Sequence, residues 1–283
     1  MQMRMPRRGR AAAVGAVACL ALGGGAVAAV AQDPAPPALN LAFGADGKLT
    51  FSGQEAVVGK AATIAVASAD PRRRAEHAAA LFRLRPDVTL AEFQRRFPRV
   101  QSFNEAAPLG VVDAFVGAPP NGAPPLTSQT AIVAGATYVV LDFSGENPTV
   151  AGSFVPGTAT PAARLPDVET STSMKDYAFN LDTLPRKGTI RITNRGKEYH
   201  EMFGFRVAKG AEPERVQRTL RAGREPKSGV NGEAFLQGPV GPGAVNQTEY
   251  AARRGTYVMA CFLPDDRGRP HVTRGMTKII RVR

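Results

Sequence analysis

The chain has 283 residues, of which 43% are apolar and 21% are charged, and it contains two cysteines, three histidines and no tryptophan. This composition supplies enough apolar side chains for one large core or two ordinary ones, so it excludes an intrinsically disordered chain and a polytopic membrane protein. A disulfide scaffold and several histidine-rich metal centres are also excluded, because cysteine and histidine are too scarce.

Residues 1–31 have the pattern of a signal peptide. Four arginines precede Ala11, an uncharged run rich in alanine and valine follows, and Ala29-Val30-Ala31 is a small-x-small cleavage site. We therefore predict export to the periplasm, the cell envelope or the outside of the cell. Cleavage would leave Cys261 as the single cysteine and lower the formal net charge from +12 to +8, because four arginines and no acidic residue are removed. A retained membrane anchor is the alternative, since the run is about long enough to span a bilayer.

The remaining sequence predicts an all-β protein. It has 29 glycines and 23 prolines over the whole chain, and the segments between them are short and rich in valine, isoleucine, phenylalanine, threonine and tyrosine. The expected strands cover residues 48–52, 62–67, 79–84, 137–143, 177–181, 188–193, 202–207, 255–262 and 277–283.

An internal repeat indicates two copies of one β-sandwich. Segments 63–66, 82–84 and 137–143 match segments 189–192, 205–207 and 256–262, and His77 falls on His200. A short helix is expected after each histidine-bearing strand, near Thr89 in the first copy and near Pro213 in the second. We therefore predict a first domain at 32–158, a linker at 159–174 and a second domain at 175–283. A chance match between two β domains of similar composition is the alternative.

Groups able to bind a metal gather in the second copy. His200 opens a strand, Cys261 ends one, and His271 and Met276 lie on the loop before the last strand. One thiolate, two imidazoles and one thioether form the ligand set of a mononuclear blue-copper site, because soft sulfur stabilises Cu(I), imidazole suits both oxidation states and a weak axial methionine tunes the potential.

This part of the chain resembles the cupredoxins, the family of plastocyanin, azurin and auracyanin. The resemblance lies in residues 194–201, in Gly255-Thr256-Tyr257 before Cys261, and in residues 270–276; it covers 175–283 well and 40–160 weakly. It implies tandem Greek-key cupredoxin-like sandwiches and one copper ion held by His200, Cys261, His271 and Met276. It also implies that His271, on an exposed loop, is where electrons leave.

Two features depart from the cupredoxin pattern. Residues 262–270 form a longer loop between Cys261 and His271 than plastocyanins and azurins use, so Asp265 or Asp266 is an alternative oxygen ligand. In the first copy His77 is kept, but Asp142, Thr149 and Phe154 are predicted to stand where Cys261, His271 and Met276 stand in the second. That copy is therefore expected to hold no type-1 copper and to serve as a support or a partner surface.

The sequence favours a one-electron carrier over an enzyme. Catalytic motifs are missing, and three histidines are too few for a multicopper oxidase or a copper nitrite reductase. Two alternatives stay open: a copper-holding or delivery protein without a redox role, and an interaction module that binds no metal. The basic charge is consistent with an acidic redox partner or an anionic envelope surface, and no motif favours nucleic acid.

Overall fold

The computed structural model describes residues 35–70, 77–100, 102–118, 122–145, 147–158 and 164–283. The predicted signal peptide lies outside these ranges, as does part of the predicted linker. Over the described ranges, no helix combines the length and the apolar character needed to cross a membrane.

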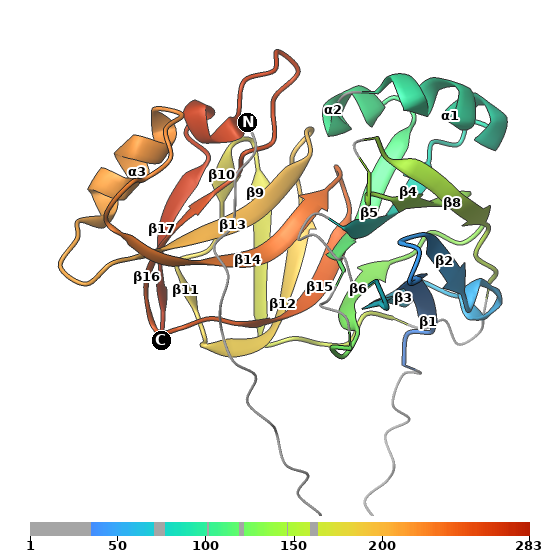
Figure 1. Cartoon of the computed structure of the whole chain (residues 1–283), viewed down its shortest axis with the longest axis horizontal. Coiled ribbons are helices and arrows are strands. Elements are labelled where there is room, and N and C mark those ends of the chain that lie inside the picture. Colours follow the sequence, from blue (N-terminus) through green and yellow to red (C-terminus); the bar gives the residue numbers. More distant parts are fainter. Residues whose placement is uncertain (1–34, 71–76, 101, 119–121, 146, 159–163) are drawn as a thin grey trace, which may run out of the picture. The chain divides into compact units, whose positions relative to one another are not determined.

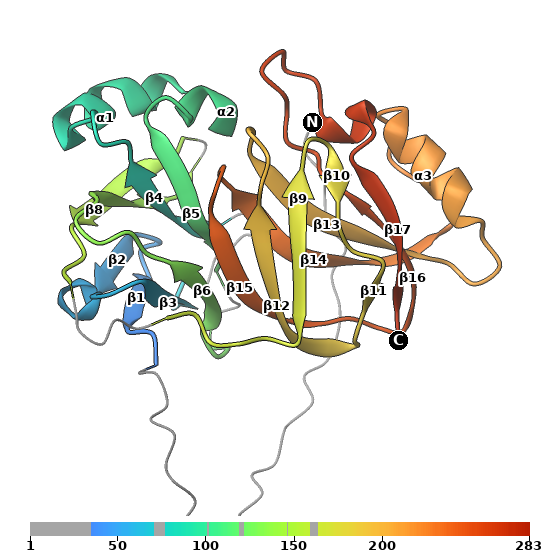
Figure 2. The ribbon, with the colours of Figure 1, turned by 180° about the vertical axis from the view of Figure 1, so that it is seen from behind.

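Three β-sheets make up the described chain (Figures 1 and 2). The first has the order β10 (Ala178–Phe179), β9 (Thr170–Lys175), β12 (Lys187–Asn194), β15 (Val245–Ala251), β6 (Leu126–Ala131), β3 (Ala61–Ser68), β1 (Ala38–Phe43) and β2 (Leu49–Ser52). The second has the order β11 (Thr183–Leu184), β17 (Thr277–Val282), β16 (Gly255–Ala260), β13 (His200–Val207) and β14 (Val230–Val240). The third has the order β5 (Gly110–Gly117), β4 (Ala78–Leu84), β7 (Tyr138–Asp142) and β8 (Thr149–Phe154). The fold is therefore all-β, as predicted.

The two halves of the chain use the same strand order. In the N-terminal half β3 pairs with β1 in parallel and with β6 in antiparallel orientation, and β12 pairs with β9 and β15 in the same two ways. The order β5-β4-β7-β8 likewise corresponds to β14-β13-β16-β17. A short helix follows the corresponding strand in each half: α1 (Leu90–Arg96) after β4, which begins one residue after His77, and α3 (Pro213–Arg221) after β13, which begins at His200.

The strand register revises part of the predicted residue matching. Ala80 pairs with Leu141 and Phe203 pairs with Ala260, which places Asp142 at the position of Cys261 as expected. Phe154, however, lies opposite Tyr138, the position that Ile280 holds opposite Tyr257. The predicted match of Phe154 with Met276, and of Thr149 with His271, was therefore wrong. Only six positions separate β7 from β8, whereas sixteen, residues 261–276, separate β16 from β17.

A shared sheet joins the two halves. β6 pairs with β15 at Asn246↔Thr130, Gln247↔Gln129 and Thr248↔Ser128, so one ladder of hydrogen bonds runs through both halves. β9 starts at Thr170, inside the segment predicted as a linker. Polar side chains add hydrogen bonds at this seam, the pairing of β6 with β15. Thr130 and Asn246 both donate to the backbone carbonyl of Asp113 at 2.7 Å. Both backbone and side-chain hydrogen bonds therefore hold the seam together.

Each half has its own apolar core, and a third cluster lies where the halves meet. Alternating apolar residues of β12, such as Ile190 and Ile192, are buried in the C-terminal core, as the period of two requires. The third cluster combines Phe93 and Phe97 from the N-terminal half with Tyr199 from the C-terminal half. Another short helix, α2 (Phe103–Ala106), lies at this contact. The residue before His200 therefore packs against the N-terminal half.

Candidate metal centre

Three fully buried side chains converge at one end of the C-terminal half. His200 is the first residue of β13, Cys261 follows β16, and His271 opens the 3-10 turn η3 (His271–Arg274). The His200 Nδ1 atom lies 3.2 Å from the His271 Nδ1 atom, and the Cys261 Sγ atom lies 3.4 Å from the same nitrogen. Within the described residues these three form a group whose ligand atoms all lie within 4.8 Å of one another.

The spacing of these atoms fits a bound metal ion. Nitrogen and sulfur ligands held about 2.0–2.3 Å from a single ion are separated from one another by roughly 3.3–3.7 Å. The separations of the His271 nitrogen from its two neighbours lie close to that range. Two imidazoles and a thiol are also a donor set that borderline and soft ions such as copper and zinc prefer. The donor set and these two separations therefore fit a bound metal ion.

Backbone turns around Asn194 place His200. The buried Asn194 side chain accepts a hydrogen bond from the Gly196 amide at 2.9 Å and donates to the carbonyls of Glu198 and Val240, each at 2.8 Å. A Cβ atom on Gly196 would lie only 2.6 Å from His200 Nε2, so this position requires glycine. The Asn-x-Gly turn thus fixes the start of β13 and the orientation of the ring.

Glu198 and Tyr177 hold His271 from the other side. His271 Nε2 lies 2.6 Å from Glu198 Oε2, and the Tyr177 hydroxyl donates to Glu198 Oε1 at 3.1 Å. A proton on Nε2 that bonds to the carboxylate leaves the Nδ1 lone pair free to face Cys261, the arrangement seen for metal-bound histidines. Asp176 and Tyr177 form a left-handed turn, with φ of 44° and 67°, that brings the Tyr177 ring within 5.1 Å of the His271 ring.

The loop before His271 is exposed at residues 266–270, as expected, but the His271 side chain itself is buried. Its relative exposure is 0%, because Glu198 and Tyr177 cover the edge of the ring that would otherwise face water. The sequence placed His271 on a loop but gave no information on what covers the loop. Glu198, two residues before His200, was part of the quoted motif, and its carboxylate was the available signal for a partner of His271.

Burial favours the neutral form of all three side chains; for His271 it lowers the pKa despite the nearby Glu198 carboxylate, which raises it. Burial, and next the repulsion from His271, lower the pKa of His200 to about 3. Burial, and next the nearby Glu201 carboxylate, raise the pKa of the Cys261 thiol far above its ordinary value. The Glu201 amide points at the sulfur, with a nitrogen-to-sulfur distance of 3.4 Å. A cation would therefore have to displace the thiol proton, as metals do at cysteine ligands.

The long loop between Cys261 and His271 folds back on itself. The Asp265 carboxylate accepts hydrogen bonds from the amides of Arg267 and Arg269, at 2.9 and 2.8 Å, and forms an ion pair with the Arg269 guanidinium at 2.9 Å. The His271 amide then donates to the Leu263 carbonyl at 2.9 Å, which returns the histidine to Cys261. Asp265 thus braces the loop, and neither it nor Asp266 belongs to the group of converging ligands.

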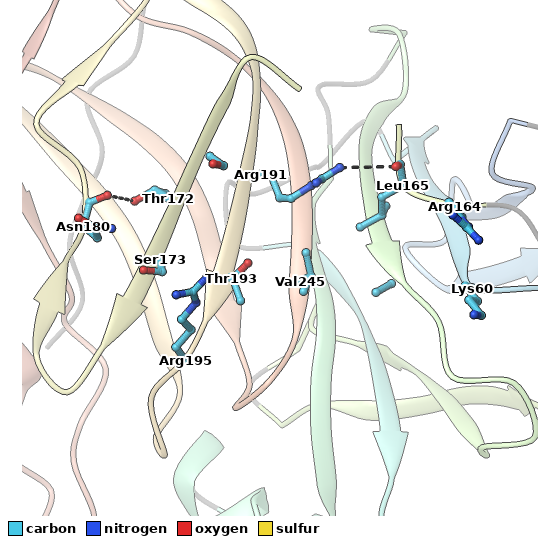
Figure 3. Close-up of a pocket in the computed structure, with 12 residues that line it drawn as sticks. Lys60, Arg164, Leu165, Thr172, Ser173, Asn180, Arg191, Thr193, Arg195 and Val245 are labelled. Carbon is cyan, nitrogen blue, oxygen red and sulfur yellow. Dashed lines mark hydrogen bonds between the residues drawn. The ribbon is translucent and has the colours of Figure 1, made fainter. Parts of the chain in front are cut away.

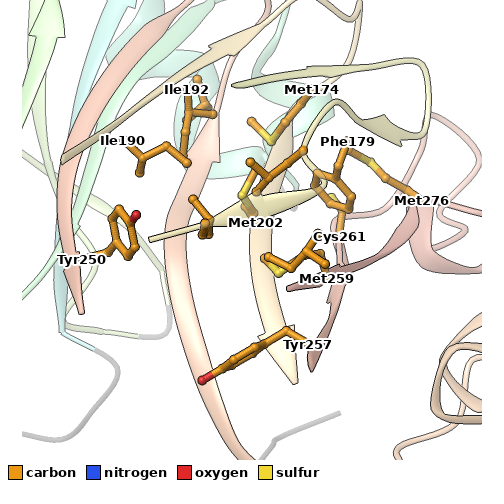
Figure 4. Packing of buried hydrophobic residues seen from close by; sticks show 14 of the residues in the cluster. Met174, Phe179, Ile190, Ile192, Met202, Tyr250, Tyr257, Met259, Cys261 and Met276 are labelled. Carbon is orange, nitrogen blue, oxygen red and sulfur yellow. The ribbon is translucent and has the colours of Figure 1, made fainter. Parts of the chain in front are cut away.

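Met276 lies in the same buried cluster as Cys261 (Figure 4). Its carbonyl accepts a hydrogen bond from the Cys261 amide at 3.3 Å, and its own amide donates to the His271 carbonyl at 3.0 Å. The cluster also contains the thioethers of Met174, Met202 and Met259. The backbone therefore ties Met276 to both Cys261 and His271.

Neither a family model nor a curated protein matches this sequence. Among solved structures, the chain is similar to a dithionite-reduced auracyanin from Roseiflexus castenholzii, with 16% identity over 40% of this chain and 95% of that one and a TM-score of 0.27. Auracyanin B matches at 12% identity over 42% and 93%, with a TM-score of 0.26. Auracyanin A, a "blue" copper protein from Chloroflexus aurantiacus, matches at 15% over 40% and 99%, with a TM-score of 0.24. Part of this chain is thus similar to auracyanins, and the case for a metal rests on His200, Cys261 and His271 themselves.

Proposed function

We propose that this protein binds one copper ion through His200, Cys261 and His271 and carries single electrons. The observation that carries the proposal is the convergence of two buried imidazoles and the buried Cys261 thiol, with the Nδ1 atom of His271 facing both other groups. Bound copper would supply the one-electron couple between Cu(I) and Cu(II). We propose no reaction on a substrate, so the protein would act as a carrier and not as an enzyme.

The residues around the site support a rigid ligand arrangement. Asn194 fixes the turn before His200, Glu198 fixes the orientation of His271, and Asp265 braces the loop between Cys261 and His271. Because all three ligand side chains are buried in packed surroundings, they have little freedom to move when the charge of the site changes. A site that changes little between two oxidation states is what rapid electron transfer requires.

We propose that Met276 would be the fourth residue to hold the copper ion. Support comes from its burial in the cluster that contains Cys261 and from its backbone hydrogen bonds to Cys261 and His271. Replacing an axial thioether with an apolar side chain should raise the reduction potential, because the remaining ligands favour Cu(I) more strongly. Met202→Leu, in the same cluster, is the matched control. A reduction potential that shifts in Met202→Leu and not in Met276→Leu would contradict the proposal and identify Met202 as the copper ligand instead.

Visible absorption of the copper-loaded protein tests the proposed site. We expect an intense charge-transfer band from the Cys261 thiolate to Cu(II), a reversible one-electron couple, and loss of the band in Cys261→Ser. Tight Cu(I) binding without a reversible couple would contradict electron transfer and favour a copper-holding or delivery protein. If the correctly folded protein takes up no copper, the metal site is contradicted and an interaction module that binds no metal is favoured.

We also infer that the chain is a tandem pair of cupredoxin-like sandwiches that is exported. The matching strand orders of the two halves support the pairing, and the pattern of residues 1–31 supports export. Amino-terminal sequencing of the protein released from its source cells checks export. A chain that begins at Met1 and is recovered from the cytoplasmic fraction would contradict it, whereas one that begins at Met1 in the membrane fraction would indicate a retained anchor.

A basic groove supports an acidic protein partner (Figure 3). The groove, of about 580 Å³, lies over the shared sheet, and its charged lining consists of Lys60, Arg164, Arg191 and Arg195. Arg191 is held in place by hydrogen bonds to the carbonyls of Leu165 and Pro166. A concave site suits an acidic chain segment better than a flat bilayer. We expect a polyglutamate peptide to bind the wild type and not Arg164→Glu/Arg195→Glu; binding to anionic vesicles alone would favour the envelope surface instead.

A further inference from the structure

One side chain of the N-terminal half hydrogen-bonds to both chain segments that carry the proposed metal ligands. Asn104, in α2, donates a short hydrogen bond from Nδ2 to the carbonyl of Pro264, within the loop between Cys261 and His271. The Oδ1 atom of the same side chain accepts a hydrogen bond from the amide of Tyr199, the residue before His200, at 3.3 Å. Asn104 therefore links the strand that carries one ligand to the loop that carries the other two.

Packing reinforces this link. Tyr199 is fully buried among residues of the N-terminal half, where its hydroxyl donates to the Gly110 carbonyl at 2.9 Å and its ring lies 5.7 Å from the Phe103 ring. Leu263, next to Pro264, packs against the cluster between the halves as well as the C-terminal core. The segment before His200 and the loop after Cys261 thus both pack against the same apolar cluster of the N-terminal half.

The loop needs such an external contact because of its length. Asp265 braces its tip internally, but that bracing does not fix the tip relative to β13. The Pro264 carbonyl lies one residue from the Leu263 carbonyl, which accepts the hydrogen bond of the His271 amide. A side chain that holds Pro264 and Tyr199 together therefore constrains the separation of His271 from His200. In the first half only six positions separate β7 from β8, so a connection of this length is particular to the second half.

We propose that Asn104 is a positioning residue for the metal centre, and that the N-terminal half sets the ligand geometry of the C-terminal half through it. This inference rests on the proposed metal site, and it assigns a role to the half that lacks the cysteine ligand. Asn104 touches no ligand side chain; it acts through the backbone of Tyr199 and Pro264.

Asn104→Asp is the informative substitution. It keeps an oxygen that accepts from the Tyr199 amide, but it replaces the donor to Pro264 with a carboxylate that repels the carbonyl. In the metal-free protein, amide hydrogen exchange at Asp265, Gly268 and His271 should become about tenfold faster, the factor expected from the loss of one hydrogen bond. Thr130→Val is the matched control, because it removes the hydrogen bond from Thr130 to the Val245 carbonyl, which joins the halves at the shared sheet, away from the loop. It should leave exchange in the loop unchanged.

The copper-loaded protein supplies the second measurement. Asn104→Asp should shift the thiolate-to-copper band and the reduction potential, and Thr130→Val should not. Equal effects of both variants, or no effect of Asn104→Asp on exchange and spectrum, would overturn the inference. If Asn104→Asp fails to fold, Asn104→Ser, which is too short to reach both partners, takes its place. If the wild type binds no copper, the proposed function fails while the exchange measurement still decides whether Asn104 orders the loop.

Discussion

Gly196 shows how closely the chain is fitted around one ligand. An added Cβ atom would lie 2.6 Å from His200 Nε2 and 3.2 Å from Asn194 Oδ1, and both neighbours are buried. Neither can move freely, because the Asn194 side chain makes three hydrogen bonds to the turn and to β14. The imidazole would have to rotate away from His271 to make room.

We therefore expect Gly196→Ala to weaken copper binding by about tenfold or more, since overpacking of this kind costs about 1–3 kcal/mol. A competition titration with a chelator measures the change. Gly117→Ala is a suitable control, because an added Cβ atom there meets nothing within 4 Å. Unchanged affinity in Gly196→Ala would mean that the ring of His200 is not held against this turn.

The loop between β16 and β17 depends on one carboxylate. Burial alone would raise the pKa of Asp265, but hydrogen bonds from the Arg269 backbone and side chain, and then from the Arg267 amide, outweigh burial and lower the pKa to about 2. An unfolded aspartate titrates near pH 4. The folded pKa is thus depressed, so the carboxylate's contribution to stability is present above about pH 4 and is lost as the pH falls toward 2.

Asp265→Asn should lower the thermal unfolding midpoint of the metal-free protein above pH 4, because the ion pair with Arg269 and part of the turn are lost. The difference from the wild type should shrink between pH 4 and pH 2, where the wild-type carboxylate becomes protonated. Scanning calorimetry across this pH range measures it. Asp266→Asn, at the exposed neighbouring position, should have no such effect. A pH-independent difference would show that the charge of Asp265 is not what braces the loop.

At the scale of the whole molecule, the shared sheet couples the two halves. Separate domains with polar contacts commonly unfold one after the other. Here β6 and β15 are neighbouring strands of one ladder, and Thr130 and Asn246 bond to the Asp113 carbonyl beside that seam. Unfolding one half would expose the edge of the other and leave these buried groups without partners.

We therefore expect the metal-free protein to unfold in one calorimetric transition, with the calorimetric enthalpy equal to the van't Hoff enthalpy. Thr130→Val should lower the midpoint of that single transition. Two resolved transitions in the wild type, or a calorimetric enthalpy near twice the van't Hoff value, would show that the halves unfold independently.

Several features could be predicted from local pattern alone. Residues of β3 and β12 carry the apolar alternation of half-buried strands, and β7 and β16 are short apolar runs that are buried on both faces. Thr89 and Pro213 mark the starts of the two helices that were expected. Other strands were missed, among them β5, β6, β14 and β15. Their sequences hold polar residues such as Thr130, Gln247 and Asn246 on buried faces, because those faces meet the other half and not solvent.

The sequence by itself determined the kind of chemistry available: one thiol, two imidazoles and a thioether, in an order that a β-sandwich can gather, because residue types and their spacing are local properties. The tertiary structure decided the rest. Glu198 and Tyr177 cover the His271 ring, and the Asp265 carboxylate accepts hydrogen bonds within its own loop instead of pointing to the site. Asn104 contacts Pro264, which is 160 positions away in the chain. Such contacts depend on how distant segments pack, and no local pattern in the chain records that packing.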